Sequence, residues 1–131
     1  MPLVMVCSVS GLLGAVVTFS FGMWTEALTF LLCAMGVDYI TGIAAALREG
    51  KGLNSGVGFW GLARKGLILL VILLAHRVDV LLQINNMAMG AATYFYITNE
   101  LISIIENYGR LGLPLPPQLR KIIEVLKEKT K

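Results

Sequence analysis

The residues of this sequence whose types and positions could support chemistry are the charged side chains inside apolar stretches. Asp38 lies near the middle of residues 24–47, a stretch long enough to cross a bilayer core of about 30 Å at about 1.5 Å per helical residue. A carboxylate at that depth costs roughly 2.5 to 3.5 kcal/mol on insertion scales, so it needs protein, water, a counter-charge or a proton. We therefore expect Asp38 to face other helices, in the same subunit or in a neighbouring copy.

Small side chains share a helix face with this acid. They recur at every fourth position around Asp38 and allow helices to approach closely in a membrane. A similar narrow ridge of small residues runs along residues 3–21. The predicted helix-packing residues are Ala34 and Ala46 on the first face, and Gly11 and Ala15 on the second.

Counting along the expected helices brings other charges to the depth of this acid. Asp38 and Glu100 both lie about 20 Å below the outer ends of their helices, and Arg64 and Lys65 lie about one turn deeper. A pair or triad reduces the cost of each charge in the membrane. The sequence therefore predicts an inner cluster of Asp38, Glu100 and either Arg64 or Lys65.

Charges near the outer ends of the helices are candidates for a second cluster. Glu26, Arg77 and Asp79 share a depth within about one turn. Two interpretations of both clusters stay open. The charges either pair within each subunit and fix the helix register, or face water or a partner subunit, so that assembly builds a polar wall.

Composition and charge placement indicate a membrane protein with one domain. Of the 131 residues, 56% are hydrophobic and 15% charged, whereas soluble domains contain about 25% charged residues. Basic residues gather in residues 48–65 and 110–131, which predicts that both regions are cytoplasmic and gives no soluble patch for nucleic acid. The chain divides into a transmembrane domain at 1–109, with a cytoplasmic loop at 48–61, and a cytoplasmic tail at 110–131.

The expected fold is an all-α, polytopic membrane helix bundle. Four spans near residues 3–21, 24–47, 62–82 and 87–105 place both termini in the cytoplasm. A three-span alternative makes the first segment interfacial or re-entrant. The tail contains three prolines and a short basic amphipathic helix from residue 118, which is expected to lie on anionic headgroups or pack against its copies. A frayed basic tail that only sets the topology is the alternative.

No constellation for catalysis stands out in the sequence. It holds one histidine, and its two cysteines, Cys7 and Cys33, lie in apolar stretches without metal-ligand spacing. The glycine-rich residues 50–56 lack the spacing of a nucleotide-binding loop. We therefore expect neither an enzyme nor a protein with a metal or cofactor.

Several motifs in register resemble the toxin-secretion and phage-lysis holin family, and the resemblance covers almost everything after Trp24. The motifs are D-x-x-T-G at Asp38, Thr41 and Gly42; L-N-S at Leu53, Asn54 and Ser55; G-L-x-R-K at residues 61–65; Asp79; E-x-x-S-I-x-E-N at residues 100–107; and G-L-P-x-P at residues 112–116.

The resemblance implies a small multi-pass protein of the bacterial cytoplasmic membrane. Such a protein associates with itself in the lipid bilayer and opens a lesion through which an endolysin or a toxin leaves the cytosol. The candidate assembly or pore residues are then Asp38, Thr41, Gly42, Arg64, Lys65, Arg77, Asp79, Glu100 and Glu106. Two competing classes are a small four-helix ion-coupled transporter or channel subunit, with Glu26 or Glu100 carrying protons, and a structural accessory of a larger membrane complex.

Overall fold

The structure, a computed structural model, describes residues 1–52 and 55–129 and is all-helical there, with no strand. This confirms the predicted fold class at the level of secondary structure. The helices are α1 (Pro2–Phe21), α2 (Glu26–Arg48), α3 (Ser55–Leu82), α4 (Met87–Arg110) and α5 (Pro117–Lys129). Short connections at residues 22–25 and 83–86 separate α1 from α2 and α3 from α4, as expected.

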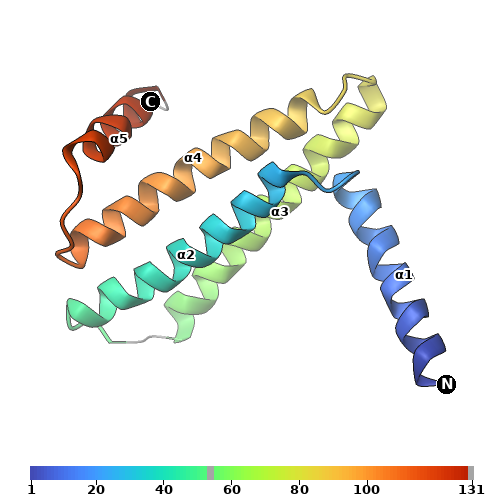
Figure 1. The fold of residues 1–131 in the computed structure, drawn as a ribbon, viewed down its shortest axis with the longest axis horizontal. Coiled ribbons are helices and arrows are strands. Elements are labelled where there is room, and N and C mark those ends of the chain that lie inside the picture. Colours follow the sequence, from blue (N-terminus) through green and yellow to red (C-terminus); the bar gives the residue numbers. More distant parts are fainter. Residues whose placement is uncertain (53–54, 130–131) are drawn as a thin grey trace.

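Three of these helices form the body of the molecule. Figure 1 shows α2, α3 and α4 running side by side, with α1 pointing away from them and α5 following the turn after α4. The α4 helix packs along both α2 and α3, which make little contact with each other. Because α4 joins the other two, residues on its inner face decide what the centre of the bundle contains.

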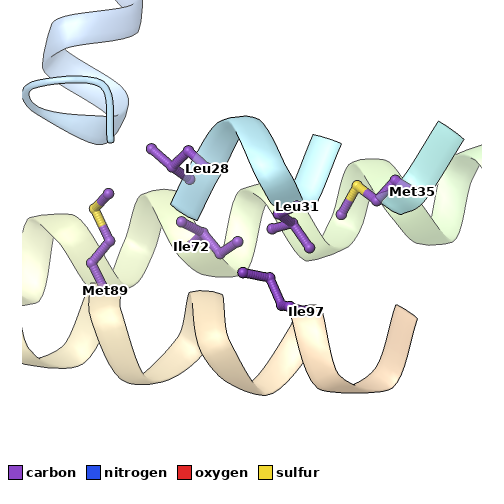
Figure 2. Close-up of a cluster of buried hydrophobic side chains, with 6 residues drawn as sticks. All are labelled: Leu28, Leu31, Met35, Ile72, Met89 and Ile97. Atoms are coloured by element: carbon purple, nitrogen blue, oxygen red, sulfur yellow. The ribbon is translucent and has the colours of Figure 1, made fainter. Parts of the chain in front are cut away.

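Apolar side chains hold together the half of this three-helix body that lies next to the connections at residues 22–25 and 83–86. Leu28, Leu31 and Met35 of α2 follow one another at steps of three and four residues, which places them on one helix face. Figure 2 shows these side chains meeting Ile72 of α3 and Met89 and Ile97 of α4. Such contacts stabilise helix association in lipid through close packing, because the lipid chains are as apolar as leucine.

The first helix leaves most of its surface uncovered. Only Ser20, close to the end of α1, is buried, and a Cβ added at Gly11 would meet no atom within 4 Å. Ala15 is exposed as well. The packing predicted for Gly11 and Ala15 therefore does not occur within one chain, and it stays a prediction about contacts between copies.

The predicted loop at 48–61 is too long, because α3 begins at Ser55. The glycines of this segment predict a loop, but in the structure they lie in a helix and the ring of Tyr39 packs against them. The Tyr39 hydroxyl donates a hydrogen bond to the Gly58 carbonyl oxygen at 3.3 Å, and a Cβ at Gly61 would lie 3.6 Å from the Tyr39 ring. Of the predicted L-N-S motif, Ser55 opens α3, whereas Leu53 and Asn54 lie outside the described residues.

Two helices in the described part of the chain, α1 and α2, are long and apolar enough to cross a membrane. The large exposed apolar side chains of α1 have the character expected of a lipid-facing helix. These features support a membrane helical protein. The four-span arrangement remains a prediction.

Candidate functional site

A largely buried cluster of three charges lies where α2, α3 and α4 meet. The Lys65 Nζ atom of α3 lies 2.9 Å from Asp38 Oδ2 of α2, and 3.0 and 2.9 Å from the two carboxylate oxygens of Glu100 of α4. Their side chains are 17%, 14% and 6% exposed, respectively. The predicted inner cluster is present, and Lys65 supplies its cation. Arg64 lies on an exposed part of α3 instead.

Asn107 completes the polar network from the last part of α4. Its Nδ2 atom lies 3.0 Å from Asp38 Oδ1, 3.1 Å from the Asp38 carbonyl oxygen and 3.0 Å from Thr41 Oγ1. Lys65 and Asn107 thus contact different oxygens of the Asp38 carboxylate. The sequence reasoning did not single out Asn107, although it stands in the E-N step of the motif at residues 100–107.

The D-x-x-T-G motif shapes the surface of α2 that receives Asn107. The Thr41 hydroxyl donates to the Val37 carbonyl oxygen at 2.8 Å, which leaves its oxygen able to accept from Asn107. A Cβ at Gly42 would lie 3.5 Å from Asn107 Nδ2, which is an ordinary contact, so a side chain longer than that of alanine would obstruct this approach. In this arrangement Asp38, Thr41 and Gly42 form one docking surface for α4.

Two carboxylates share one ammonium group in this cluster. With Asp38, Glu100 and Lys65 all ionised, its net charge is −1. A buried group of this kind is stabilised by its hydrogen bonds but depends on every partner, because removing one leaves an uncompensated charge. The cluster can therefore specify how the three helices meet, and it places strongly polar groups inside an apolar bundle.

A cavity of about 1050 Å³ borders the cluster, between α2, α3 and α4. It extends from the charge cluster to the segment between α2 and α3. Its lining combines charged and hydroxyl groups with apolar side chains, and it includes Asp38, Lys65, Glu100, Arg64, Lys51 and Ser103. Among the described residues no group of three or more histidine, cysteine or acidic side chains is placed to hold a metal ion.

The predicted outer cluster of Glu26, Arg77 and Asp79 is wrong. Asp79 accepts hydrogen bonds from the backbone N–H groups of Ala88 and Met89 at 2.7 and 2.8 Å. These N–H groups belong to the first turn of α4, where intrahelical acceptors are missing and the helix dipole favours an anion. The carboxylate of Asp79 is therefore used as the cap of α4.

Arg77 contacts the end of α1 instead of an acid. Its Nη1 atom donates to the Phe19 carbonyl oxygen at 3.4 Å, and its guanidinium carbon lies 4.3 Å from the centre of the Phe19 ring. A cation suits the C-terminal end of a helix, and an aromatic face attracts it further. Glu26 opens α2, and within the described ranges no ion pair joins it to Arg77 or Asp79.

The C-terminal ends of α2 and α4 are joined by an exposed ion pair. Arg110 Nη2 lies 2.6 Å from Glu49 Oε1, and Arg110 Nη1 lies 3.3 Å from Asn107 Oδ1. The hydrogen bond from Arg110 holds the pKa of the Glu49 carboxyl below its usual value. Glu106 lies one residue before Asn107, on the exposed side of α4.

Outward-facing apolar helices around a buried polar cluster are features of a membrane helix bundle. The chain belongs to the bacteriophage holin family, whose sequence model matches residues 15–128. This confirms the resemblance found in the motifs.

Relatives with similar sequences come from bacteria and from a phage. The chain is 45% identical over 123 residues to an uncharacterized protein of Halalkalibacterium halodurans, covering 90% of each chain. It is 41% identical over 118 residues to an uncharacterized 14.9 kDa protein in the nagH 3′ region of Clostridium perfringens, covering 89% of each. A probable holin of Bacillus phage phi105 is 33% identical over 90 residues, covering 69% of this chain and 66% of the phage protein. No solved structure gives a significant match.

Proposed function

We propose that this protein is a holin that oligomerises in the bacterial cytoplasmic membrane. Once assembled, it opens a lesion through which an endolysin or a toxin leaves the cytosol. In this proposal α1 to α4 each cross the membrane, and the α2–α3 connection, α5 and both termini are cytoplasmic. Family membership and the similarity to a phage protein described as a probable holin support this function.

The observation that carries the proposal is the buried Asp38–Lys65–Glu100 cluster. Three ionised groups are expensive in a lipid-facing bundle, and intramembrane charges commonly mark a pathway for polar species. Here they are held in the contact between three helices. If these contacts are exchanged for contacts with other copies, the same side chains can line a polar wall.

A lesion that opens abruptly follows from mass action on such an assembly. The α1 helix offers the exposed small residues Gly11, Gly14 and Ala15, which permit close contacts with a second helix. As the protein accumulates, contacts between copies replace contacts with lipid above a threshold concentration. The time of opening should then depend on the expression level.

The experiment that tests this function is induced expression in a bacterium that contains a cytosolic reporter enzyme and a potential-sensitive dye. We expect an abrupt loss of membrane potential together with reporter release, after a delay that shortens as expression rises. An equally expressed Gly42→Leu variant should change the time of both signals, because leucine would block the approach of Asn107 that holds α4 against α2 within one chain. Reporter retention at full depolarisation would contradict a protein-sized lesion.

A small ion-coupled transporter or channel subunit is the second candidate function. It is favoured by one observation, the burial of Glu100 beside a cavity. This class predicts depolarisation or solute flux without release of the reporter enzyme. The same culture therefore separates the two functions.

A further inference from the structure

The cavity between α2, α3 and α4 has a cation that the cluster does not use. Lys65 is neutralised by Asp38 and Glu100. Arg64 also lines the cavity, is exposed, and makes no ion pair or hydrogen bond with the rest of the described chain. A guanidinium group in such a place is suited to a phosphate group, because two parallel N–H groups can donate to two of its oxygens.

The beginning of α3 adds positive potential to the same cavity. Ser55 and Val57, in the first turn of α3, line it together with Arg64. The N-terminal end of a helix carries a partial positive charge, and the Cα–Cβ bonds of a helix point toward that end. The Cα–Cβ bond of Arg64 therefore points toward the end of α3 where an anion is favoured, and Arg64 lines the cavity that reaches this end. Lys51 lies at this end of the cavity as well, with its Nζ atom 3.6 Å from Glu49 Oε1, so part of its charge is offset.

Another part of the cavity wall is apolar. Ile43 of α2 and Phe59, Leu67 and Ile68 of α3 line it, so a ligand that fits both parts must combine an anionic group with a hydrocarbon chain. Arg64 lies about 27 Å along α3 from Leu82, at about 1.5 Å per residue. In the topology proposed above, that depth is close to the inner boundary of a hydrocarbon core of about 30 Å.

We propose that this cavity binds one anionic phospholipid of the inner leaflet. The lipid phosphate lies between Arg64 and the first turn of α3, and one acyl chain follows Ile43, Leu67 and Ile68. Basic pockets between membrane helices on the cytoplasmic side are suited to such headgroups. The proposal uses the topology given under the proposed function but does not require a lesion, so it concerns the closed protein.

Lipid retention by the purified full-length chain tests the proposal. Native mass spectrometry would compare dioleoyl phosphatidylglycerol with dioleoyl phosphatidylcholine, which differ in headgroup charge but not in their chains. We expect the wild type to retain phosphatidylglycerol at a concentration at least about tenfold lower. Arg64→Gln should abolish this preference and Arg64→Lys should keep part of it, whereas the matched Arg120→Gln on α5 should keep all of it.

Two further measurements separate a lipid site from a simple anion site. Filling the apolar wall with Ile43→Trp should weaken retention of both lipids, provided that circular dichroism shows unchanged helix content. Inorganic phosphate should displace phosphatidylglycerol only at a concentration at least about a hundredfold higher, because it has no chain to bury. Equal retention of the two lipids by the wild type, or an unchanged preference in Arg64→Gln, would overturn the proposal.

Two other results would also overturn it. Displacement by phosphate as effectively as by lipid would assign the cavity to a free anion. Loss of the preference in Arg120→Gln alone would assign lipid selectivity to the tail. Because retention is measured without lysis, its failure leaves the reporter-release experiment unaffected, so the two proposals fail separately.

Discussion

The Nζ atom of Lys65 lies within 3.0 Å of both carboxylate oxygens of Glu100, although the two residues are 35 positions apart and belong to different helices. The same nitrogen also contacts Asp38, so one ammonium group joins two acids in this contact of α2, α3 and α4. The stability of the bundle should therefore depend on Lys65 more than on any neighbouring cation.

Replacing Lys65 by methionine should destabilise the bundle by about 3 to 5 kcal/mol, because it leaves two buried carboxylates without their cation. Arg64→Met is the matched control, since Arg64 is the adjacent residue but is exposed and makes no ion pair with the described part of the chain. It should change the stability by no more than about 0.5 kcal/mol. Denaturant unfolding of both variants in the same detergent, free of anionic lipid, gives the comparison, and equal effects would show that Lys65 contributes no more than Arg64.

Neutralising the whole cluster should cost much less than removing its centre. In a triple variant with Asp38→Asn, Lys65→Met and Glu100→Gln, no member of the cluster is left charged. Replacing a complete buried ion group is often close to neutral in stability. The same unfolding assay should therefore place the triple variant above Lys65→Met. A triple variant less stable than Lys65→Met would mean that the charges themselves stabilise the bundle.

The cap of α4 gives a second prediction. The helix is capped by the carboxylate of Asp79, and not by the side chain of Asn86, which is the residue at the N-cap position. Asn86 stands directly before α4, yet its side chain makes no capping hydrogen bond and its backbone has φ 60°. Asp79→Ala should cost about 0.5 to 2 kcal/mol and speed hydrogen exchange at the Ala88 and Met89 amides. Asn86→Gly should leave that exchange unchanged, because glycine adopts this φ without strain. Unchanged exchange in Asp79→Ala would contradict the cap.

Sequence reasoning reached the inner cluster but not the outer one, for a physical reason. Counting residues gives the depth of a side chain along its helix, but not the direction in which the helix is turned. At the inner end the acids Asp38 and Glu100 needed a cation, and Lys65 met that need. Asp79 instead accepts hydrogen bonds from the backbone N–H groups of α4, which compete with Arg77 for its carboxylate and are not considered when charges alone are counted.

The sequence did not predict that α3 begins as early as Ser55, for a different reason. Glycines lower helix propensity, so residues 55–61 were expected to form a loop. Contacts with Tyr39 of α2 accompany a helix there, and Gly58 leaves room for the Tyr39 hydroxyl, which would lie only 3.2 Å from a Cβ at that position. Such a tertiary contact cannot be read from the local composition.

The connection between α1 and α2 gives a third prediction, at Gly22. Its backbone has φ 70° and ψ −148°, a region that residues with a Cβ essentially do not adopt. In addition, a Cβ placed on Gly22 would lie 2.7 Å from His76 Cε1. Gly22→Ala should therefore cost about 1 to 3 kcal/mol. His76→Ala in the same chain should recover only the part due to the contact, because the backbone strain remains.

Gly14 supplies the matched control for this substitution. It lies within α1, and a Cβ added there would meet no atom within 4 Å. Gly14→Ala should stabilise the helix by about 0.5 to 1 kcal/mol, so the two substitutions should have opposite signs in a thermal unfolding series. A Gly22→Ala variant as stable as Gly14→Ala would show that the connection can adopt another conformation.

The ion pair between Glu49 and Arg110 gives a pH dependence with a defined sign. Its hydrogen bond to Arg110 lowers the pKa of Glu49 in the folded chain. A carboxyl with a lowered folded pKa stabilises the fold above its unfolded pKa of about 4.3, and this contribution is lost as the pH falls through the folded value. The wild type should therefore be more stable than Glu49→Gln at pH 7, and the difference should disappear at strongly acidic pH.

Thermal unfolding across this range measures the difference, with Glu124→Gln on α5 as the control for losing an exposed carboxylate. High salt should shrink the difference at pH 7, because an exposed pair is screened. A difference that grows toward acidic pH would show that Glu49 is not held ionised by Arg110.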